Sequence, residues 1–294
     1  MRRRPFGQSG LEVSVLGFGA MQAGDPRLPE AHVARLLNHA LDLGLTLVDT
    51  ARSYGISEER IGRHLAHRRD EYLLSTKLGY GAAGSPDWTY ESVVAGVDAA
   101  CNRLQTDVID IVHLHSCALE LLEEGEVVRA LEDCRDAGKL RFAAYSGDSA
   151  ALRYAIASGA FASVQASVNL CDQEALRALR EASDCGLGTI AKRPLAGQPW
   201  RARGSSQEPV HAEYARRFEL LRTEPGFDAD DMEALTLRFA AYSPGVDCAI
   251  VGGTDLHHLE QNVAAVSAGP LDKSRYEAIR AAFRKVGTGW QGLV

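Results

Sequence analysis

Short apolar segments alternate with amphipathic segments of helical period along almost the whole chain, and this alternation restricts the possible folds more than any other feature. The apolar segments predict strands over residues 15–19, 47–50, 72–77, 108–114, 140–145, 162–168, 188–192 and 247–251. The segments between them predict helices over residues 29–43, 57–65, 89–104, 126–137, 149–158, 173–185, 211–241 and 256–268. Strands that are separated by helices pair in parallel, and eight of them are the number that closes a barrel. We therefore expect an α/β protein with the (β/α)8 TIM barrel fold.

Three parts of the chain lie outside this alternation. Residues 3–6 and 11–13, joined by a glycine-containing turn, predict an N-terminal β-hairpin that plugs one end of the barrel. Residues 194–210 are too long for a minimal βα connection and are typical of a lid or a ligand-binding loop. Residues 273–286 predict a C-terminal extra helix. No stretch is rich enough in proline, serine or charge to mark a linker, so we expect one domain over residues 1–294.

Composition and charge restrict the class of partner. The chain has 294 residues, 46% of them apolar, and its formal net charge is −7. This charge argues against a broad surface that binds nucleic acid or an anionic membrane, and it favours small-molecule partners. It is compatible with a local basic pocket that binds a phosphorylated ligand. The apolar runs are too short to cross a bilayer, and residues 1–10 lack the hydrophobic segment of a signal peptide, so we expect a cytoplasmic protein. The six cysteines form no Cys-x-x-Cys pair and predict neither a zinc site nor a disulfide framework.

Four residues with reactive side chains follow three successive predicted strands. Asp49 lies at the end of the second strand and Tyr54 follows it, Lys77 ends the third, and His115 follows the fourth. In a barrel, the carboxyl ends of the strands line one mouth, where active sites are built. Each residue also has an ordinary explanation: the aspartate caps a loop, the tyrosine is half-buried, the lysine reaches the surface, and the histidine is satisfied at a strand end. Only the combination indicates chemistry.

The chemistry of this combination suits carbonyl reduction. An ammonium group beside a tyrosine stabilises the phenolate and makes the hydroxyl a better proton donor. Lys77 would supply that ammonium to Tyr54, and Asp49 would supply the counter-charge that keeps the lysine protonated. His115 would then hold and orient the oxygen of a carbonyl substrate. Together they would protonate a carbonyl oxygen while a hydride reaches the carbonyl carbon.

Several segments resemble the aldo-keto reductase superfamily, and the resemblance spans almost the whole chain. These segments are 16–21 (LGFGAM), 47–55 (LVDTARSYG), 75–79 (STKLG), 107–115 (DVIDIVHLH), 164–169 (VQASVN), 251–252 (VG) and 258–262 (HLEQN). The resemblance implies a (β/α)8 enzyme that moves a hydride between NADPH and a carbonyl compound. It implies that Tyr54 is the general acid and base and that Lys77 and Asp49 tune the acidity of its hydroxyl group. It also implies that His115 orients the substrate.

The resemblance implies a set of cofactor contacts as well. Ser146, Gly147 and Gln165 would bind the nicotinamide carboxamide, and Gln261 and Asn262 would bind the adenine. A buried Gln165 satisfied by backbone groups is the alternative, as is plain solvation of Gln261 and Asn262. The further residues that the resemblance implies at the cofactor are Gly19, Ala20, Met21, Asp49, Lys192, Arg193, Pro194, Leu195, Gly252, Gly253, Thr254 and His258.

Two departures from the family pattern concern the cofactor. Where many relatives place an aromatic residue under the nicotinamide, this chain has Lys192, and the neighbouring Arg193 would stack or hold phosphate. Where relatives often carry Lys or Arg in the last phosphate-binding segment, it has Gly252, Gly253 and His258, although amides at the start of the following helix would still bind an anion. The expected preference for NADPH is weakened, and NADH becomes possible. Candidate replacements for the missing charge are Arg201, Arg203, His257 and His258.

The expected substrate is a small carbonyl compound, and the loops carry no chemistry that defines it further. Its pocket would combine residues 194–210 with Met21, Gln22, Tyr54, Trp88 and His115. Packing of Trp88 at the rim, where it would hold its own loop down, is an equal alternative for that residue.

Three other classes of protein fit less well. Gly17-Phe18-Gly19 begins like a dinucleotide-binding fingerprint, but the third glycine is absent, which disfavours a doubly wound fold. His113 and His115 put two imidazoles on one strand face, as in metal-dependent barrel hydrolases, yet the other histidines fall on predicted helices or their edges, and we expect no metal. A non-catalytic NADP-sensing regulatory protein of the same fold is the main alternative. It is disfavoured because all four catalytic positions are kept and no interaction tail is added.

Overall fold

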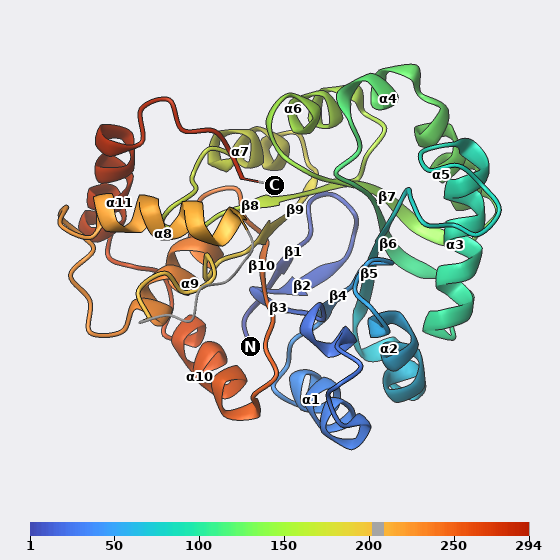
Figure 1. The fold of residues 1–294 in the computed structure, drawn as a ribbon, viewed down its shortest axis with the longest axis horizontal. Coiled ribbons are helices and arrows are strands. Elements are labelled where there is room, and N and C mark those ends of the chain that lie inside the picture. Colours follow the sequence, from blue (N-terminus) through green and yellow to red (C-terminus); the bar gives the residue numbers. More distant parts are fainter. Residues whose placement is uncertain (202–208, 294) are drawn as a thin grey trace.

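The computed structural model describes residues 1–201 and 209–293. Eight parallel strands close into a barrel in the order β10, β3, β4, β5, β6, β7, β8 and β9 (Figure 1). Their bounds are β3 (Leu16–Gly19), β4 (Leu47–Asp49), β5 (Leu73–Leu78), β6 (Ile109–His115), β7 (Leu140–Ser146), β8 (Ser163–Ser167), β9 (Gly188–Lys192) and β10 (Cys248–Val251). The (β/α)8 TIM barrel that the alternation predicts is confirmed.

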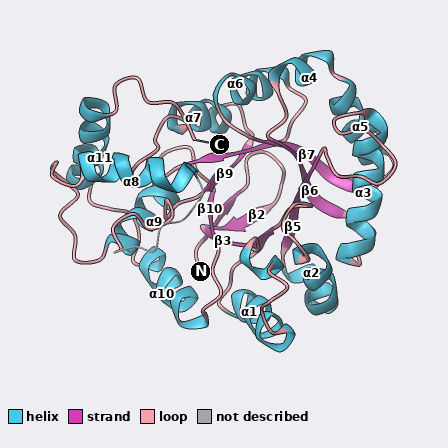
Figure 2. Cartoon of the chain, viewed as in Figure 1, coloured by secondary structure: helices cyan, strands magenta, loops and turns pink. Residues whose placement is uncertain are grey.

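Helices surround the barrel on its outside (Figure 2). They are α1 (Glu30–Asp42), α2 (Ser57–Leu65), α3 (Tyr90–Leu104), α4 (Leu119–Glu124), α5 (Glu126–Asp136), α6 (Ser149–Ser158), α7 (Leu176–Asp184), α8 (Pro209–Leu221), α9 (Met232–Tyr242), α10 (Leu256–Ser267) and α11 (Lys273–Val286). Two 3-10 helices, η1 (Gln22–Gly24) and η2 (Ala66–Glu71), complete the helical elements of the described residues. The C-terminal extra helix, α11, has the predicted bounds.

The structure differs from the predicted helices in two places. The helical segment expected over residues 211–241 is two helices, α8 and α9. Pro225 and Gly226 lie between them; proline cannot donate a helical hydrogen bond, and Gly226 has a φ of +96°. Helix α4 was not predicted because six residues are too few to establish a helical period.

The N-terminal hairpin closes the amino end of the barrel. Strands β1 (Arg3–Pro5) and β2 (Glu12–Ser14) pair antiparallel. Gly7 has a φ of +52°, and a side chain here would lie 2.4 Å from the backbone nitrogen of Gly188 at the start of β9, so only glycine allows this contact. Phe6 is 1% exposed and packs with apolar residues of the barrel interior, namely Leu47, Ile111, Ala144, Ile190, Cys248 and Ile250. The predicted plug is confirmed, and it leaves the carboxyl ends of the strands open.

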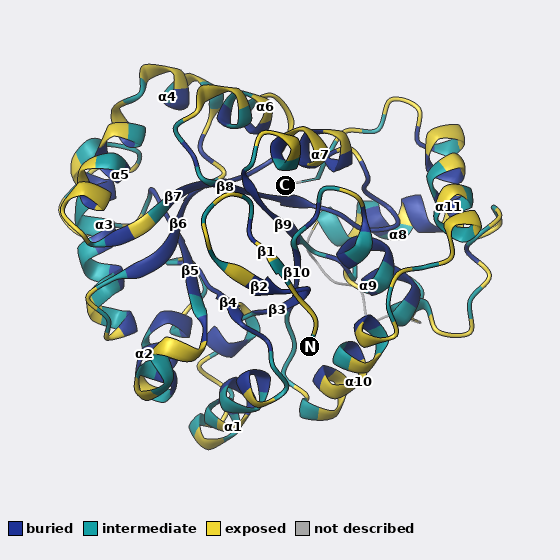
Figure 3. Ribbon diagram, turned by 180° about the vertical axis from the view of Figure 1, so that it is seen from behind, coloured by how far each residue is buried: buried dark blue, intermediate teal, exposed yellow. Residues whose placement is uncertain are grey.

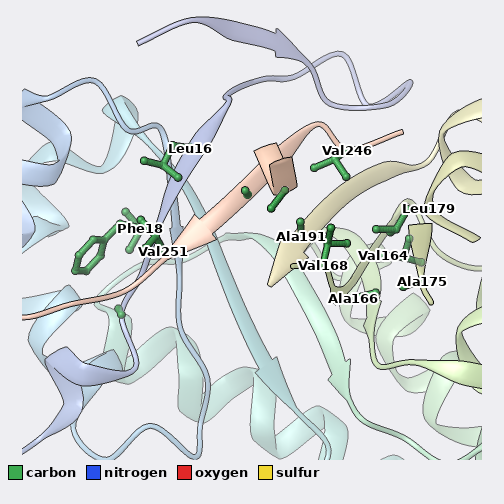
Figure 4. Close-up of a cluster of buried hydrophobic side chains, with 14 of the residues drawn as sticks. Leu16, Phe18, Val164, Ala166, Val168, Ala175, Leu179, Ala191, Val246 and Val251 are labelled. Atoms are coloured by element: carbon green, nitrogen blue, oxygen red, sulfur yellow. The ribbon is translucent and has the colours of Figure 1, made fainter. Parts of the chain in front are cut away.

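The main hydrophobic core lies between the strands and the helices. Figure 3 shows buried strands inside a ring of helices whose outward sides are exposed. Val33 and Leu36 of α1 are buried at helical spacing, as an amphipathic helix requires. In Figure 4, Val164 of β8 lies beside Leu179 of α7. Among the described residues, no helix has both the length and the apolar content needed to span a membrane.

Candidate active site

Strands β4, β5 and β6 are neighbours in the barrel (Figure 1). Asp49, Lys77 and His115 lie at their carboxyl ends. The register pairs Asp49 with Ser75 and Lys77 with His113. Since side chains two residues apart share a strand face, Ser75 and Lys77 both point to the side of the sheet that carries Asp49. The barrel thus brings Lys77 and His115 close to Asp49, although they follow it by 28 and 66 positions in the sequence.

Tyr54 lies on the loop between β4 and α2. Gly55 has a φ of +55°, and a side chain at Gly24 in η1 would lie 1.7 Å from the carbonyl oxygen of Tyr54. Two glycines therefore allow this loop to pack backbone against backbone on η1. The amide of Ile56 donates to the carbonyl of Gly24 at 3.1 Å, which fixes the contact. The loop holds Tyr54 over the carboxyl end of β4.

Lys77 and Asp49 form a buried ion pair. The Lys77 Nζ atom lies 2.5 Å from Asp49 Oδ2 and donates to the carbonyl of Thr50 at 2.8 Å, and the two side chains are 1% and 2% exposed. Burial opposes both charges, but the pairing outweighs it. The pKa of Asp49 is lowered and the pKa of Lys77 is raised as a result. Both groups are therefore charged at neutral pH.

The ring of Tyr54 lies next to this pair and next to His115. The Lys77 Nζ atom is 5.0 Å from the centre of the Tyr54 ring, and the nearby tyrosine side chain, after Asp49, helps to raise the pKa of Lys77. The rings of Tyr54 and His115 meet edge to face, with their centres 6.1 Å apart. All four residues, Asp49 included, line one cavity of about 660 Å³. The predicted catalytic residues converge.

His115 is held as a neutral imidazole. Burial, and then the positive charges of Lys77 and Lys192, lower its pKa to about 3. Its Nδ1 atom lies 2.6 Å from the hydroxyl of Tyr80, which was not among the predicted site residues. Tyr80 follows Lys77 by only three positions, but no sequence pattern indicates that its side chain turns toward β6.

His113 should make the protein less stable in acid. Burial lowers its folded pKa to about 4, so the unfolded chain binds the extra proton between pH 6.5 and about 4. Stability is therefore lost as pH falls through this window, by up to about 1.4 kcal/mol per pH unit. We expect His113→Gln to show a shallower decrease in the free energy of unfolding, measured in urea at pH 7, 6 and 5.

The pH dependence that other titratable groups contribute is common to the wild type and His113→Gln, so it cancels when their slopes are compared. Asp172, whose pKa burial raises to about 7, acts in the opposite direction in both. Equal slopes for the wild type and His113→Gln would show that His113 does not contribute.

A network of side chains surrounds the Asp49 carboxylate. Asp49 Oδ1 accepts from Ser75 Oγ at 2.8 Å and from Gln165 Nε2 at 3.2 Å, and Gln165 Oε1 accepts from Ser146 Oγ at 3.0 Å. His113 Nε2 lies 3.1 Å from the same Ser75 hydroxyl. Gln165 is thus satisfied by side chains rather than by the backbone. Ser75 and His113 were not predicted as site residues; their alternation with Lys77 and His115 along the strands is the signal that would have revealed them.

The segment after β10 approaches the segment after β3. A side chain at Gly252 would lie 2.7 Å from the carbonyl oxygen of Gly19 and 2.3 Å from Gln22 Oε1. Gln22 Oε1 is buried and makes no hydrogen bond within the described residues. At the start of α10, Asp255 accepts from the amide of His258 at 2.9 Å, so this amide is already used by the cap.

Residues 192–195 line the cavity from the end of β9. The Lys192 ammonium lies 3.5 Å from Asp148 Oδ2, and burial lowers its pKa. Arg193 has a φ of +55° and donates to the carbonyl of Leu293 at 2.9 Å, so it binds the C-terminal tail. Arg201 pairs with Glu233. Arg203 lies outside the described residues.

Most of the predicted site residues meet at this cavity. Those that line it are Gly19, Met21, Gln22, Asp49, Tyr54, Lys77, His115, Ser146, Gln165, Lys192, Arg193, Pro194, Leu195, Gly252, Gly253, Thr254, His258 and Asn262. Ala20, Trp88, Gly147 and Gln261 do not line it. Gln261 is exposed and lies 3.1 Å from His257, and Trp88 packs against Tyr80 with ring centres 5.8 Å apart.

Two further regions bear on the alternatives. A second cavity of about 460 Å³ lies at the amino ends of the strands, where Arg69 and Arg141 both pair with Asp110; it contains none of the predicted site residues. In residues 1–201 and 209–293, no group of three or more His, Cys, Asp or Glu side chains is placed to hold a metal ion.

The chain belongs to the aldo/keto reductase family, whose sequence profile matches residues 15–284. It is 27% identical to L-galactose dehydrogenase of Arabidopsis thaliana over 280 residues, which cover 90% of this chain and 88% of that protein. It is also 27% identical to the uncharacterized oxidoreductase YqkF of Bacillus subtilis, with 96% of each chain covered.

Solved structures are similar as well. The aldo-keto reductase AKR11C1 from Bacillus halodurans, in its holo form, superposes with a TM-score of 0.82 at 25% identity and 96% coverage of each chain. A putative aldo-keto reductase from Pseudomonas aeruginosa gives a TM-score of 0.73 at 28% identity, covering 90% of this chain and 95% of that one. The family and these relatives place the protein among the oxidoreductases.

Proposed function

We propose that this protein reduces aldehydes or ketones to alcohols, with NADPH as the hydride source and Tyr54 as the proton donor. The observation that carries the proposal is the buried Lys77–Asp49 pair, whose ammonium lies against the Tyr54 ring inside a cavity that His115 also lines. A phenol supported in this way is suited to give up a proton and to exist briefly as a phenolate.

The residues of the cavity fit a nicotinamide dinucleotide. Gln165 has one further N–H group and one further lone pair beyond the bonds it makes, which suits the donor and acceptor of a carboxamide. Ser146 would bind the same amide. The buried Gln22 Oε1 lacks a partner within the described residues and would accept a hydrogen bond from the cofactor. Residues 252–254 and Asn262 would hold its far end.

The preference for NADPH over NADH is part of the proposal. His258, at the start of α10, and Arg201 both line the cavity, and we propose that both would contact a phosphate group, Arg201 while it is paired with Glu233. The amide of His258 already donates to Asp255, so a phosphate here would be bound mainly by side chains rather than by this backbone donor. We therefore propose NADPH as the better cofactor and NADH as a weaker one.

The residues of this chain donate the proton, stabilise the phenolate that remains and orient the substrate. When bound, NADPH supplies the hydride that reduces the carbonyl carbon. Tyr54 donates its hydroxyl proton to the carbonyl oxygen, and the Lys77 ammonium stabilises the phenolate that remains. Asp49 and the Thr50 carbonyl keep the ammonium in place. His115, which is neutral, orients the carbonyl oxygen.

The substrate would enter between the η1 segment and the loop after β9. Met21 is 48% exposed and lines the cavity together with Gln22 and residues 194–198. We propose that these residues, with Tyr54 and His115, select a small carbonyl compound. We propose a cytoplasmic location, which agrees with six cysteines that are all free.

The direct test combines binding and turnover. We expect NADPH to quench the fluorescence of the three tryptophans saturably and more tightly than NADH, and we expect at least one aldehyde in a panel to be reduced over many turnovers. Binding without turnover of any carbonyl compound would favour the NADP-sensing alternative. Absence of binding would contradict the proposal, and activity that is lost only on chelation would favour a metal-dependent reaction.

A further inference from the structure

We propose that Tyr80 is a positioning residue that keeps the proton of His115 on Nε2, where it faces the substrate. The inference rests on the proposed reduction, because it assigns His115 a defined role as a hydrogen-bond donor to the carbonyl oxygen. Tyr80 lies on the segment after β5 and reaches across to the end of β6.

The contact between the two side chains is close and doubly defined. The Tyr80 hydroxyl lies 2.6 Å from His115 Nδ1. The two rings also stack, with their centres 5.7 Å apart and an angle of 26° between their planes. The hydroxyl has a second neighbour, Ser53 Oγ, at 3.2 Å. Tyr80 therefore restrains both the orientation of the imidazole and the environment of one of its nitrogens.

The direction of this hydrogen bond defines the tautomer. A phenol has one proton to donate, and an imidazole nitrogen is a stronger acceptor than a serine hydroxyl. The distance to Nδ1 is also shorter than the distance to Ser53, so we assign the proton of Tyr80 to the bond with His115, and the Ser53 hydroxyl then donates to the Tyr80 oxygen. A neutral imidazole that accepts at Nδ1 carries its proton at Nε2.

The proton on Nε2 is free to meet a ligand. His115 lines the cavity, and no residue within the described ranges forms a hydrogen bond with its Nε2 atom. The other tautomer would turn a lone pair toward the carbonyl oxygen and repel it. With the assigned tautomer, Tyr54 O–H and His115 Nε2–H both donate to that oxygen.

The fold holds Tyr80 by means of Trp88. The Trp88 ring packs edge to face on Tyr80. The backbone amide of Trp88 donates to the carbonyl of Gly79 at 2.7 Å. Gly79 has a φ of +130°, and a side chain there would lie 2.2 Å from the Trp88 ring. Glycine at position 79 thus lets the indole close against Tyr80. This arrangement gives Trp88 a supporting role behind Tyr80.

The test compares Tyr80→Phe with Tyr90→Phe in the full chain. Tyr90 is the matched control because its hydroxyl bonds to Asp133 on the outer helices. We expect Tyr80→Phe to lower kcat/KM for a reduced aldehyde about tenfold and to leave the Kd of NADPH unchanged, whereas Tyr90→Phe changes neither. Equal kcat/KM in Tyr80→Phe and the wild type would overturn the proposal.

A tautomer measurement separates positioning from general damage. In ¹⁵N-histidine spectra of the cofactor-free protein, with the resonance assigned by His115→Gln, we expect Nε2 to be protonated and Nδ1 to accept a hydrogen bond. In Tyr80→Phe the Nδ1 resonance should move downfield, as for a nitrogen without a hydrogen bond. A proton on Nδ1 of the wild type would overturn the inference. This measurement needs no turnover, so it remains decisive even if the proposed reductase activity fails.

Discussion

Tyr54→Phe should lower kcat by about 10²- to 10⁴-fold, the range that a positioned general acid contributes. The substitution removes only the hydroxyl group, while the ring that packs beside Lys77 and His115 is kept. Binding of NADPH should therefore be unchanged within about twofold, because the residues proposed to hold the cofactor are untouched. Steady-state kinetics with a reduced aldehyde and a fluorescence titration with NADPH measure the two quantities.

Two observations make this result specific to the site. Tyr90→Phe removes a tyrosine hydroxyl that bonds to Asp133 outside the cavity, so it should retain wild-type kinetics. If Tyr54→Phe kept its turnover, another group would have to be the proton donor. If it lost NADPH binding as well, the change would have damaged the site as a whole, and the assignment of the proton would lack support.

Lys77→Met should be both inactive and strongly destabilised. The Asp49 carboxylate would keep its buried position and lose its only ion-pair partner within the described residues, and breaking one side of a buried pair costs about 3–5 kcal/mol. The same change removes the ammonium that supports the Tyr54 phenolate. We expect a large decrease in the free energy of unfolding, measured in urea, together with loss of aldehyde reduction.

A second substitution separates these two effects. In Lys77→Met with Asp49→Asn, the carboxylate charge is gone, and the new amide still accepts from Ser75, so we expect most of the stability to return without any activity. Arg177→Met is the control for loss of an ion pair, because Arg177 is 89% exposed beside Glu181 and should barely matter. Normal stability of the single Lys77 variant would contradict our account of the pair.

The fold follows from local patterns to a large extent. Helices α2, α6 and α11 and strand β9 have the bounds that apolar periodicity predicts, since each element buries one face or one run of residues. The segment over residues 211–241 is helical as predicted, but the prediction did not divide it into α8 and α9, because its apolar residues recur on both sides of Pro225 and Gly226. At this position the proline and glycine residues indicate the end of a helix, and the spacing of the apolar residues does not.

The candidate site was likewise predicted from the sequence only in part. Asp49, Lys77 and His115 were found because each comes where a predicted strand ends, and parallel strands in a barrel place those ends at one mouth. The pairing of Lys77 with Asp49 was predicted as well, but two other contacts of these residues were not: the hydrogen bond of Gln165 to Asp49 and that of Tyr80 to His115. Gln165 is 116 positions from the Asp49 carboxylate that it contacts, and Tyr80 is 35 positions from His115. Nothing in the local sequence of either partner encodes that distance.

By itself, the sequence of this protein determined the eight-stranded architecture, the hairpin plug and the identity of the four residues at the mouth. These are properties of alternation and of residues next to strand ends, which short-range geometry controls. Only the tertiary structure decided that Tyr80 rather than Trp88 reaches the site and that Arg193 binds the tail at Leu293. The physical reason is that loop side chains take their positions from whichever distant segment packs against them, and strand register and barrel closure bring that segment into place.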